Sequence, residues 1–122
     1  MTNAISWFEI PALKYERAKK FYETVLEISI NDMHMENMKY GVFPYEQQKG
    51  VGGAILESDM AKPTDQGTAV YFNGGDDLSK PLAKVEAAGG KILMPKTNIG
   101  ENGFMAHILD TEGNHVALHS MN

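Results

Sequence analysis

The chain has 122 residues, a net charge of −5, 43% hydrophobic residues and no cysteine. This length gives a single domain that can bury a core. Without cysteine there are no disulfides, thiolate metal sites or cysteine nucleophiles. An acidic chain that lacks a basic patch is not expected to bind nucleic acid or an anionic membrane. No apolar run reaches the ~20 residues of a membrane span, and the N-terminus lacks the form of a signal peptide, so we expect a cytoplasmic protein.

The first half of the chain reads as a strand, a helix and three further strands. An apolar segment predicts a strand over residues 5–10, closed by Pro11. A helix begins at Lys14 or Tyr15, because apolar residues then recur at helical spacing up to position 26. Strands are predicted over residues 29–36, 38–43 and 51–57, and residues 58–66 read as the loop between halves.

The second half repeats this order. A strand is predicted over residues 68–73 and a helix over residues 78–88, with Pro81 in its first turn and two glycines at its end. Strands follow over residues 91–94, 104–109 and 115–119, with a loop over residues 95–103. The repeat predicts an α+β fold of two βαβββ modules. They form a curved mixed sheet with a central cleft and with helices on its outer face. We expect one domain, residues 1–122, with module one over about residues 1–60 and module two over about residues 67–122.

Three segments resemble a known family: residues 16–22 (ERAKKFY), 85–90 (VEAAGG) and 110–114 (DTEGN). The last is similar to the Asp-Pro-Asp-Gly-Asn turn of the vicinal oxygen chelate superfamily, with Thr111 in place of proline. That superfamily includes glyoxalases, extradiol dioxygenases, bleomycin resistance proteins and fosfomycin-modifying enzymes. The resemblance covers nearly the whole chain and implies the fold, but it does not specify a reaction.

The resemblance also implies where a metal would bind, since the superfamily takes one His or Glu from each of four strands. Spacing puts these positions at Trp7, near residues 53–55, near Ala69 (or Thr68) and at Ala117. Indole, methyl and aliphatic groups do not bind a divalent cation. We therefore expect a divergent member with no metal and no cofactor, and the resemblance implies a homodimer.

Strand alternation gives a second set of site residues, because successive side chains face opposite sides of a sheet. Phe8 and Ile10 are expected to face the helices, and the same argument applies to the strands of the second half. The residues predicted to face the cleft are Trp7, Glu9, Tyr71, Asn73 and His119.

Each of these residues has two readings. Glu9 is a general base or polar anchor for a ligand, or it pairs with a neighbouring strand or subunit. His119 is its acid–base partner, or an exposed or capping histidine. Trp7 and Tyr71 stack on a flat or apolar ligand, or fill the cavity themselves. Asn73 contacts the ligand, or begins the turn that follows.

The other histidines carry less weight. His34 is expected at an edge or interface. His107, His115 and His119 form a loose cluster, but His115 and His119 would be about 13 Å apart on one strand at ~3.3 Å per residue. That separation is too wide for one ion, so the cluster is interpreted as incidental.

Three functions stay open. The first is a small-molecule binder with a metal-free cleft, acting in sequestration or resistance. The second is a lyase or isomerase acting on a carbonyl compound, with Glu9 as base and with Tyr71, Asn73 or His119 stabilising the enolate. The third is a non-catalytic interaction protein with a filled cavity.

Overall fold

The computed structural model describes residues 3–122, which form two four-stranded sheets. In spatial order the first sheet consists of β1 (Trp7–Pro11), β4 (Gly52–Glu57), β3 (Met38–Val42) and β2 (Asn31–Met35). The second sheet consists of β5 (Tyr71–Asn73), β8 (His115–Ser120), β7 (Phe104–Leu109) and β6 (Lys91–Asn98). In each sheet the first pair is parallel and the others are antiparallel. The predicted α+β fold of two βαβββ modules is confirmed.

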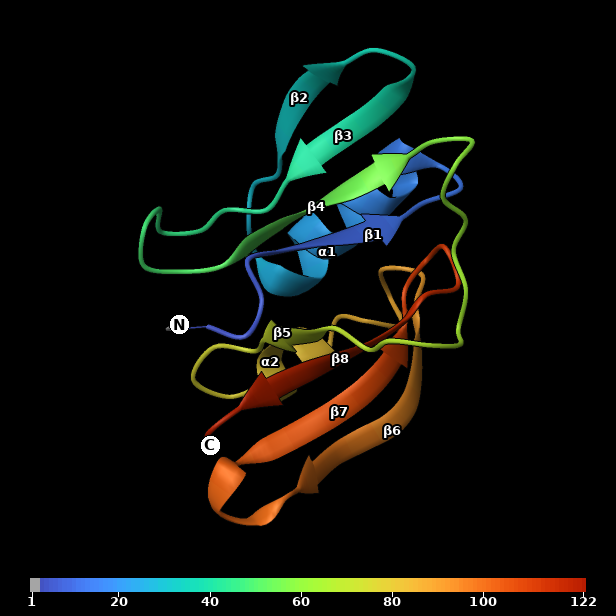
Figure 1. Cartoon of the computed structure of the whole chain (residues 1–122). Coiled ribbons are helices and arrows are strands. Elements are labelled where there is room, and N and C mark those ends of the chain that lie inside the picture. Colours follow the sequence, from blue (N-terminus) through green and yellow to red (C-terminus); the bar gives the residue numbers. More distant parts are fainter. Residues whose placement is uncertain (1–2) are drawn as a thin grey trace.

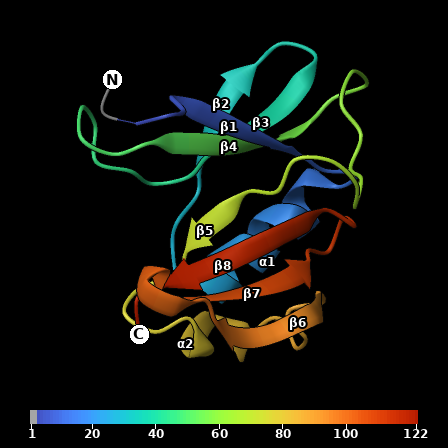
Figure 2. The same cartoon turned by 60° about the horizontal axis from the view of Figure 1, so that its bottom comes forward.

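The two sheets lie with β1 and β5 toward each other, and the helices cover one side of them (Figures 1 and 2). The other side is free of helices. We call it the cleft face, and it carries the side chains of each strand that point away from the helices.

Helix α1 (Tyr15–Leu26) forms as the sequence predicts, and its buried side faces the core. Its start is fixed by carboxylates from elsewhere in the chain. Glu57 accepts a hydrogen bond of 2.8 Å from the Tyr15 amide, and Glu112 accepts one of 2.8 Å from the Lys14 amide. Such partners satisfy amide groups that a helix leaves free at its first turn.

The second helix is shorter than predicted. Helix α2 spans only Ser79–Leu82, and the chain then continues as turns as far as Gly89. Its backbone hydrogen bonds are of two kinds. Some span three residues, such as the bond from the Lys84 amide to the Pro81 carbonyl, and others span four, such as the bond from the Ala83 amide to the Ser79 carbonyl. That mixture keeps the segment compact without a regular α-helix.

Strand β6 is longer than predicted, because the sequence prediction ended this strand before Pro95. It runs on to Asn98 through two shifts of register, and Pro95 lies at the second, between Met94 and Thr97. An edge strand tolerates proline at such an irregularity, since no ladder bond needs its missing N–H. A single turn of 3₁₀-helix, Gly100–Asn102, then leads to β7.

Aromatic side chains join the two modules in one core. Phe72 of β5 packs against Phe8 of β1 with ring centroids 5.6 Å apart, and against Tyr22 of α1 at 5.2 Å. Phe43, just after β3, completes this group at 5.4 Å from Phe72. The modules thus share one hydrophobic core behind the sheets.

No helix among residues 3–122 has the length and apolar character needed to cross a membrane.

Candidate functional site

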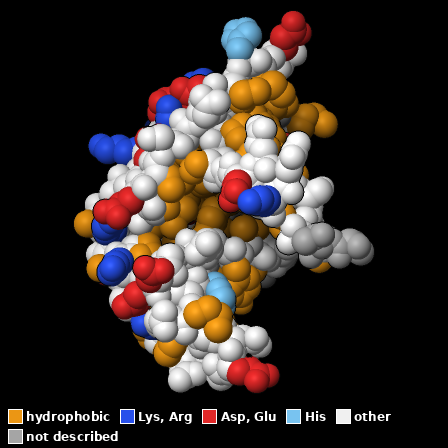
Figure 3. Space-filling model, turned by 90° about the vertical axis from the view of Figure 1, so that its left-hand side faces the viewer, with side chains coloured by type: hydrophobic (Ala, Val, Ile, Leu, Met, Phe, Trp, Pro, Cys, Tyr) orange, Lys and Arg blue, Asp and Glu red, His pale blue; other side chains and the backbone are white. Residues whose placement is uncertain are grey.

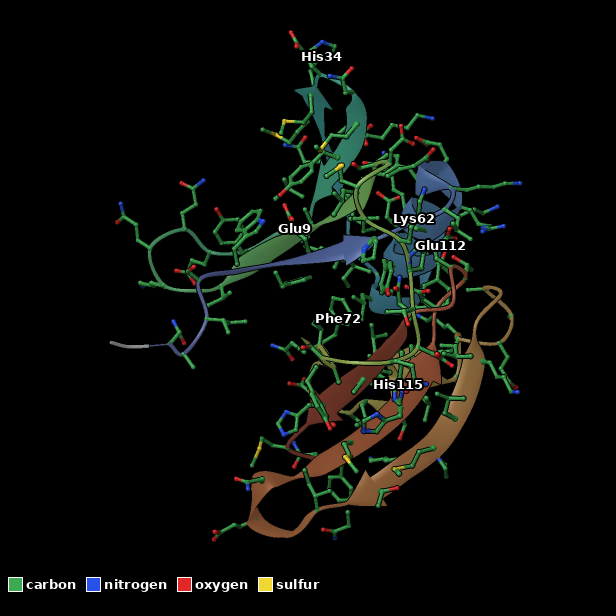
Figure 4. The ribbon with its side chains drawn as sticks, turned by 45° about the vertical axis from the view of Figure 1, so that its right-hand side comes forward. Glu9, His34, Lys62, Phe72, Glu112 and His115 are labelled. Carbon is green, nitrogen blue, oxygen red and sulfur yellow. The ribbon has the colours of Figure 1, made fainter. Side chains whose placement is uncertain are left out.

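Strand β1 divides its side chains between the core and the cleft face as alternation predicts. Phe8 and Ile10 pack with the core, whereas Trp7 and Glu9 are exposed on the other side. Figure 4 shows Glu9 on β1 and His115 on β8, with Phe72 between the two modules. The two halves of the cleft face therefore carry different polar groups.

Module one contributes a chain of three side chains on the cleft face. The Trp7 indole Nε1 donates a hydrogen bond of 3.0 Å to the Tyr40 hydroxyl. That hydroxyl donates one of 2.7 Å to Glu9 Oε2. Burial, and then the Glu9 carboxylate, raise the pKa of Tyr40. Glu9 is therefore held by a residue of β3, the second strand along from β1, and its charge faces the cleft.

Sequence reasoning did not select Tyr40. The signal was available, because Tyr40 lies between Met38 and Val42 on a predicted strand and shares their face. Only the pairing of β3 with β4, and of β4 with β1, brings its hydroxyl to Trp7 and Glu9. That pairing depends on residues distant in sequence.

Module two contributes a second chain of polar groups. The Tyr71 hydroxyl lies 3.1 Å from His107 Nε2, and His107 Nδ1 lies 2.7 Å from His115 Nε2. Burial, followed by the neighbouring His115, lowers the pKa of His107. Two of the three histidines that were interpreted as an incidental cluster are therefore in direct contact. Spacing along one strand separates His115 from His119, whereas His107 and His115 lie on the paired strands β7 and β8.

The two remaining candidates have local partners. Asn73 Oδ1 accepts a hydrogen bond of 2.9 Å from the Gly75 amide, which is the turn-forming reading. His119 Nε2 lies 2.7 Å from the Asn102 carbonyl oxygen. Glu9 and His119 lie on different sheets, and no hydrogen bond joins them within residues 3–122.

The acidic turn between β7 and β8 supports the fold. Glu112 is buried and accepts hydrogen bonds from the backbone ahead of α1 and from Arg17, whose Nε lies 2.7 Å from it. Burial raises the pKa of Glu112, but the hydrogen bonds from Arg17, the Lys14 amide and Thr111 outweigh this effect, so its pKa lies below the ordinary value. This carboxylate is a structural ion-pair partner.

A cavity of about 660 Å³ is lined by residues from the start of β1 and from β5. Trp7 and Tyr71 line it together with Phe8, Val51, Val70 and Phe72. Within residues 3–122 it has fourteen lining residues, and none of them is charged or a histidine. Trp7 is 37% exposed and Tyr71 51% exposed. Figure 3 shows hydrophobic side chains gathered in a hollow between the two halves.

Comparison of the sequence with models of known protein families gives a match. The model of the Glyoxalase/Bleomycin resistance protein/Dioxygenase superfamily matches residues 4–118. The chain belongs to this superfamily.

Two curated relatives within the superfamily are the putative glyoxylase CFP32 of Mycobacterium bovis and that of Mycobacterium tuberculosis. Each is 27% identical over 120 residues, which cover 96% of this chain and 45% of the relative. The chain thus spans about half the length of the curated relatives it matches.

Solved structures show the same fold at low identity. A glyoxalase I mutant from Zea mays matches with a TM-score of 0.73 at 20% identity, over 94% of this chain and 45% of that one. A glyoxalase/bleomycin resistance protein from Albidiferax ferrireducens matches with a TM-score of 0.70 at 16% identity, over 98% of this chain and 100% of that one. The fosfomycin resistance protein FosX from Listeria monocytogenes matches with a TM-score of 0.69 at 13% identity, over 100% of this chain and 94% of that one.

The residues at the superfamily's metal positions do not fit a metal. Trp7 donates its indole N–H to Tyr40, and Ala54, the residue of 53–55 that pairs with Glu9, is fully buried. Ala69 and Ala117 offer only methyl groups. Residues 3–122 contain no group of three His, Asp or Glu side chains arranged to hold an ion.

Proposed function

We propose that this protein binds a small, largely apolar organic molecule in the cavity between β1 and β5, without a metal at the superfamily's positions. The observation that carries this proposal is the cavity of about 660 Å³ with its uncharged lining. Ligand sites are commonly apolar clefts of roughly 300–1,000 Å³ with a few polar groups. The open cavity argues against the filled-cavity interaction protein.

Trp7 and Tyr71 are the proposed ligand contacts. They come from the two facing modules, and both rings line the cavity while remaining partly exposed. Their flat surfaces suit an aromatic or planar ligand, because aromatic pairs gain about 0.5–1.5 kcal/mol beyond burial. Asn73 also lines the cavity, and its side-chain amide is the proposed polar contact.

A thermal-shift screen of small aromatic, carbonyl and drug-like compounds tests this proposal, since a ligand of the native state raises the melting temperature. We expect binders whose effect is lost in Trp7→Ala and in Tyr71→Ala. Met60→Ala is the matched control, because Met60 is 94% exposed and does not line the cavity. Binders that are insensitive to both aromatic variants would place the ligand elsewhere.

A second candidate function is a lyase or isomerase acting on a carbonyl compound, with Glu9 as base and His119 as a further catalytic group. The observation that favours it is the fixed position of Glu9, whose Oε2 accepts a hydrogen bond of 2.7 Å from Tyr40 on the cleft face. If Glu9 removes a proton, Glu9→Gln lowers turnover while ligand affinity is kept. Equal loss of affinity and turnover would favour the binding role.

We also propose that two copies associate. Met33 and Met35 of β2 are 46% and 42% exposed, and their register partners in β3 are Tyr40 and Met38. The relatives of about twice this length are consistent with a pair of such units. Light scattering of the purified protein tests this, and Met33→Lys is expected to yield monomers if the methionines are covered in the dimer. The cytoplasmic location stays a prediction.

A further inference from the structure

We propose that Tyr71, His107 and His115 form a proton-accepting site beside the cavity, which selects ligands that carry an acidic hydroxyl group, such as a phenol or an enol. This inference rests on the proposed function, because Tyr71 is the member of the three that lines the cavity. It deepens that function by naming the class of ligand.

The geometry depends on Ala117. Ala117 of β8 is the register partner of Tyr71 on β5 and of His107 on β7, so it lies between them on the same face. It is fully buried, and the Tyr71 ring reaches across β8 until its hydroxyl is 3.1 Å from His107 Nε2. A larger side chain at position 117 would occupy this path. The small residue at a superfamily metal position thus makes room for a hydrogen-bonded chain.

The hydrogen-bonded side chains of Tyr71, His107 and His115 can accept one additional proton. The Tyr71 hydroxyl oxygen lies 3.1 Å from His107 Nε2 and 3.7 Å from the Met105 sulfur. In the neutral state we assign its proton to His107 Nε2, the stronger acceptor, and the His107 Nδ1 proton to His115 Nε2. In the other tautomer His115 donates to His107 and the Tyr71 oxygen accepts. If His107 gains a proton at Nε2, both of its N–H groups still have acceptors, namely the Tyr71 oxygen and His115 Nε2. Burial and the neighbouring His115 lower the pKa of His107, which keeps its ring neutral before a ligand binds. The imidazolium formed on binding therefore depends on the ligand oxyanion for its stability.

The residues around His107 and His115 offer no other proton acceptor beside the Tyr71 hydroxyl among residues 3–122. Met94 of β6 lies opposite His107, and Lys91 of β6 lies opposite Leu109, the register partner of His115. On β8, His119 is bound to the Asn102 carbonyl. Glu9 belongs to the other sheet and is held by Tyr40. Among residues 3–122, the cavity lining has no Lys, Arg or His.

Binding then moves one proton, and the charges balance. The ligand hydroxyl gives its proton to the Tyr71 oxygen, while the Tyr71 proton moves to His107 Nε2. The products are a ligand oxyanion that accepts a hydrogen bond from the Tyr71 hydroxyl, and an imidazolium at His107. The oxyanion–hydroxyl bond is charge-assisted, which makes it stronger than a neutral one.

The test uses 4-nitrophenol and 4-nitroanisole, which share a ring and differ in the acidic proton. Both are titrated into the purified protein at a pH below the pKa of free 4-nitrophenol, with Trp7 emission as the binding signal and the phenolate colour as the ionisation signal. We expect 4-nitrophenol to bind as the coloured phenolate, about tenfold more tightly than 4-nitroanisole. Tyr71→Phe should reduce its affinity to that of 4-nitroanisole and abolish the colour.

Tyr71→Phe keeps the ring, and the hydroxyl that it removes belongs to a half-exposed residue, so the fold is expected to survive and is checked by thermal melting. His107→Gln should have the same effect as Tyr71→Phe, whereas His34→Gln on the exposed β2 strand should have none. If 4-nitroanisole binds and 4-nitrophenol binds no better or remains colourless, this inference is overturned while the proposed function stands. If neither compound binds, both are overturned.

Discussion

The Tyr22 hydroxyl in α1 donates a hydrogen bond of 2.6 Å to Asp110 Oδ2 in the turn before β8. The helix of module one is thereby tied to the last strand pair of module two. Tyr22 is fully buried, and burial followed by the Asp110 charge raises its pKa well above the ordinary value. The same Asp110 accepts hydrogen bonds from the Glu112 and Asn114 amides, so the turn and the helix share one carboxylate.

Tyr22→Phe removes that bond and keeps the ring in the aromatic core. Because a hydrogen bond to a charged group contributes about 1.5–3 kcal/mol, we expect a loss of that order in the free energy of unfolding. Urea denaturation measures it. Tyr45→Phe is the control, since Tyr45 is 38% exposed and its hydroxyl has no hydrogen bond within residues 3–122. Equal stability of the two variants would contradict the anchoring role.

Glu112→Gln tests the ion pair with Arg17. The pKa of Glu112 in the folded protein lies below its ordinary value. The charged carboxylate therefore stabilises the fold fully at a pH above the pKa of the unfolded state. This stabilisation is lost as the pH falls through the pKa of the folded state. We expect the free energy of unfolding of Glu112→Gln to be about 2 kcal/mol lower than that of the wild type at neutral pH. This difference should become smaller in acid. Denaturation at several pH values measures this.

Glu46→Gln is the control for that experiment. Glu46 pairs with Lys49 at 3.4 Å, and both side chains are more than 70% exposed. Exposed pairs contribute roughly 0–1 kcal/mol, so this variant should follow the wild type at every pH. A constant gap for Glu112→Gln from neutral to acid pH would show that its charge has no part in stability.

Gly53→Ala tests how tightly the Phe8 ring packs against β4. A methyl group at Gly53 would lie 2.2 Å from the Phe8 ring, which packs against Phe43 and Phe72. Overpacking of a filled core costs about 1–3 kcal/mol, and we expect a lower melting temperature to match. Gly50→Ala is the control, because its nearest neighbour atom would be 3.4 Å away. Unchanged stability of Gly53→Ala would mean that Phe8 can move aside.

Much of the fold could be predicted from the sequence, because β1, α1 and the last two strands carry strong local patterns. The parts that could not be predicted depend on tertiary context. Residues 78–88 have a helical pattern, but only Ser79–Leu82 form an α-helix. Strand β6 passes through Pro95 because, as an edge strand with irregular register, it does not need that residue's amide.

The candidate site was predicted in part. Alternation within single strands placed Trp7 and Glu9 on the cleft face, since that property is local. The partners of these residues were missed because they arise from pairing between strands. Tyr40 meets Glu9 only through β4, and His107 meets His115 only through the β7–β8 register. Spacing along one strand cannot reveal either contact.

We propose that the cavity between β1 and β5 binds an organic ligand without a metal. Trp7 is the single tryptophan of the chain and lines this cavity, so its emission reports directly on binding there. The most direct measurement is a titration of 4-nitroanisole, followed by Trp7 emission, in protein treated with a chelator and again after zinc, nickel or iron(II) is added. We expect saturable binding in chelator-treated protein, with an affinity that added metal does not increase. Binding that occurs only after a divalent cation is added would contradict it.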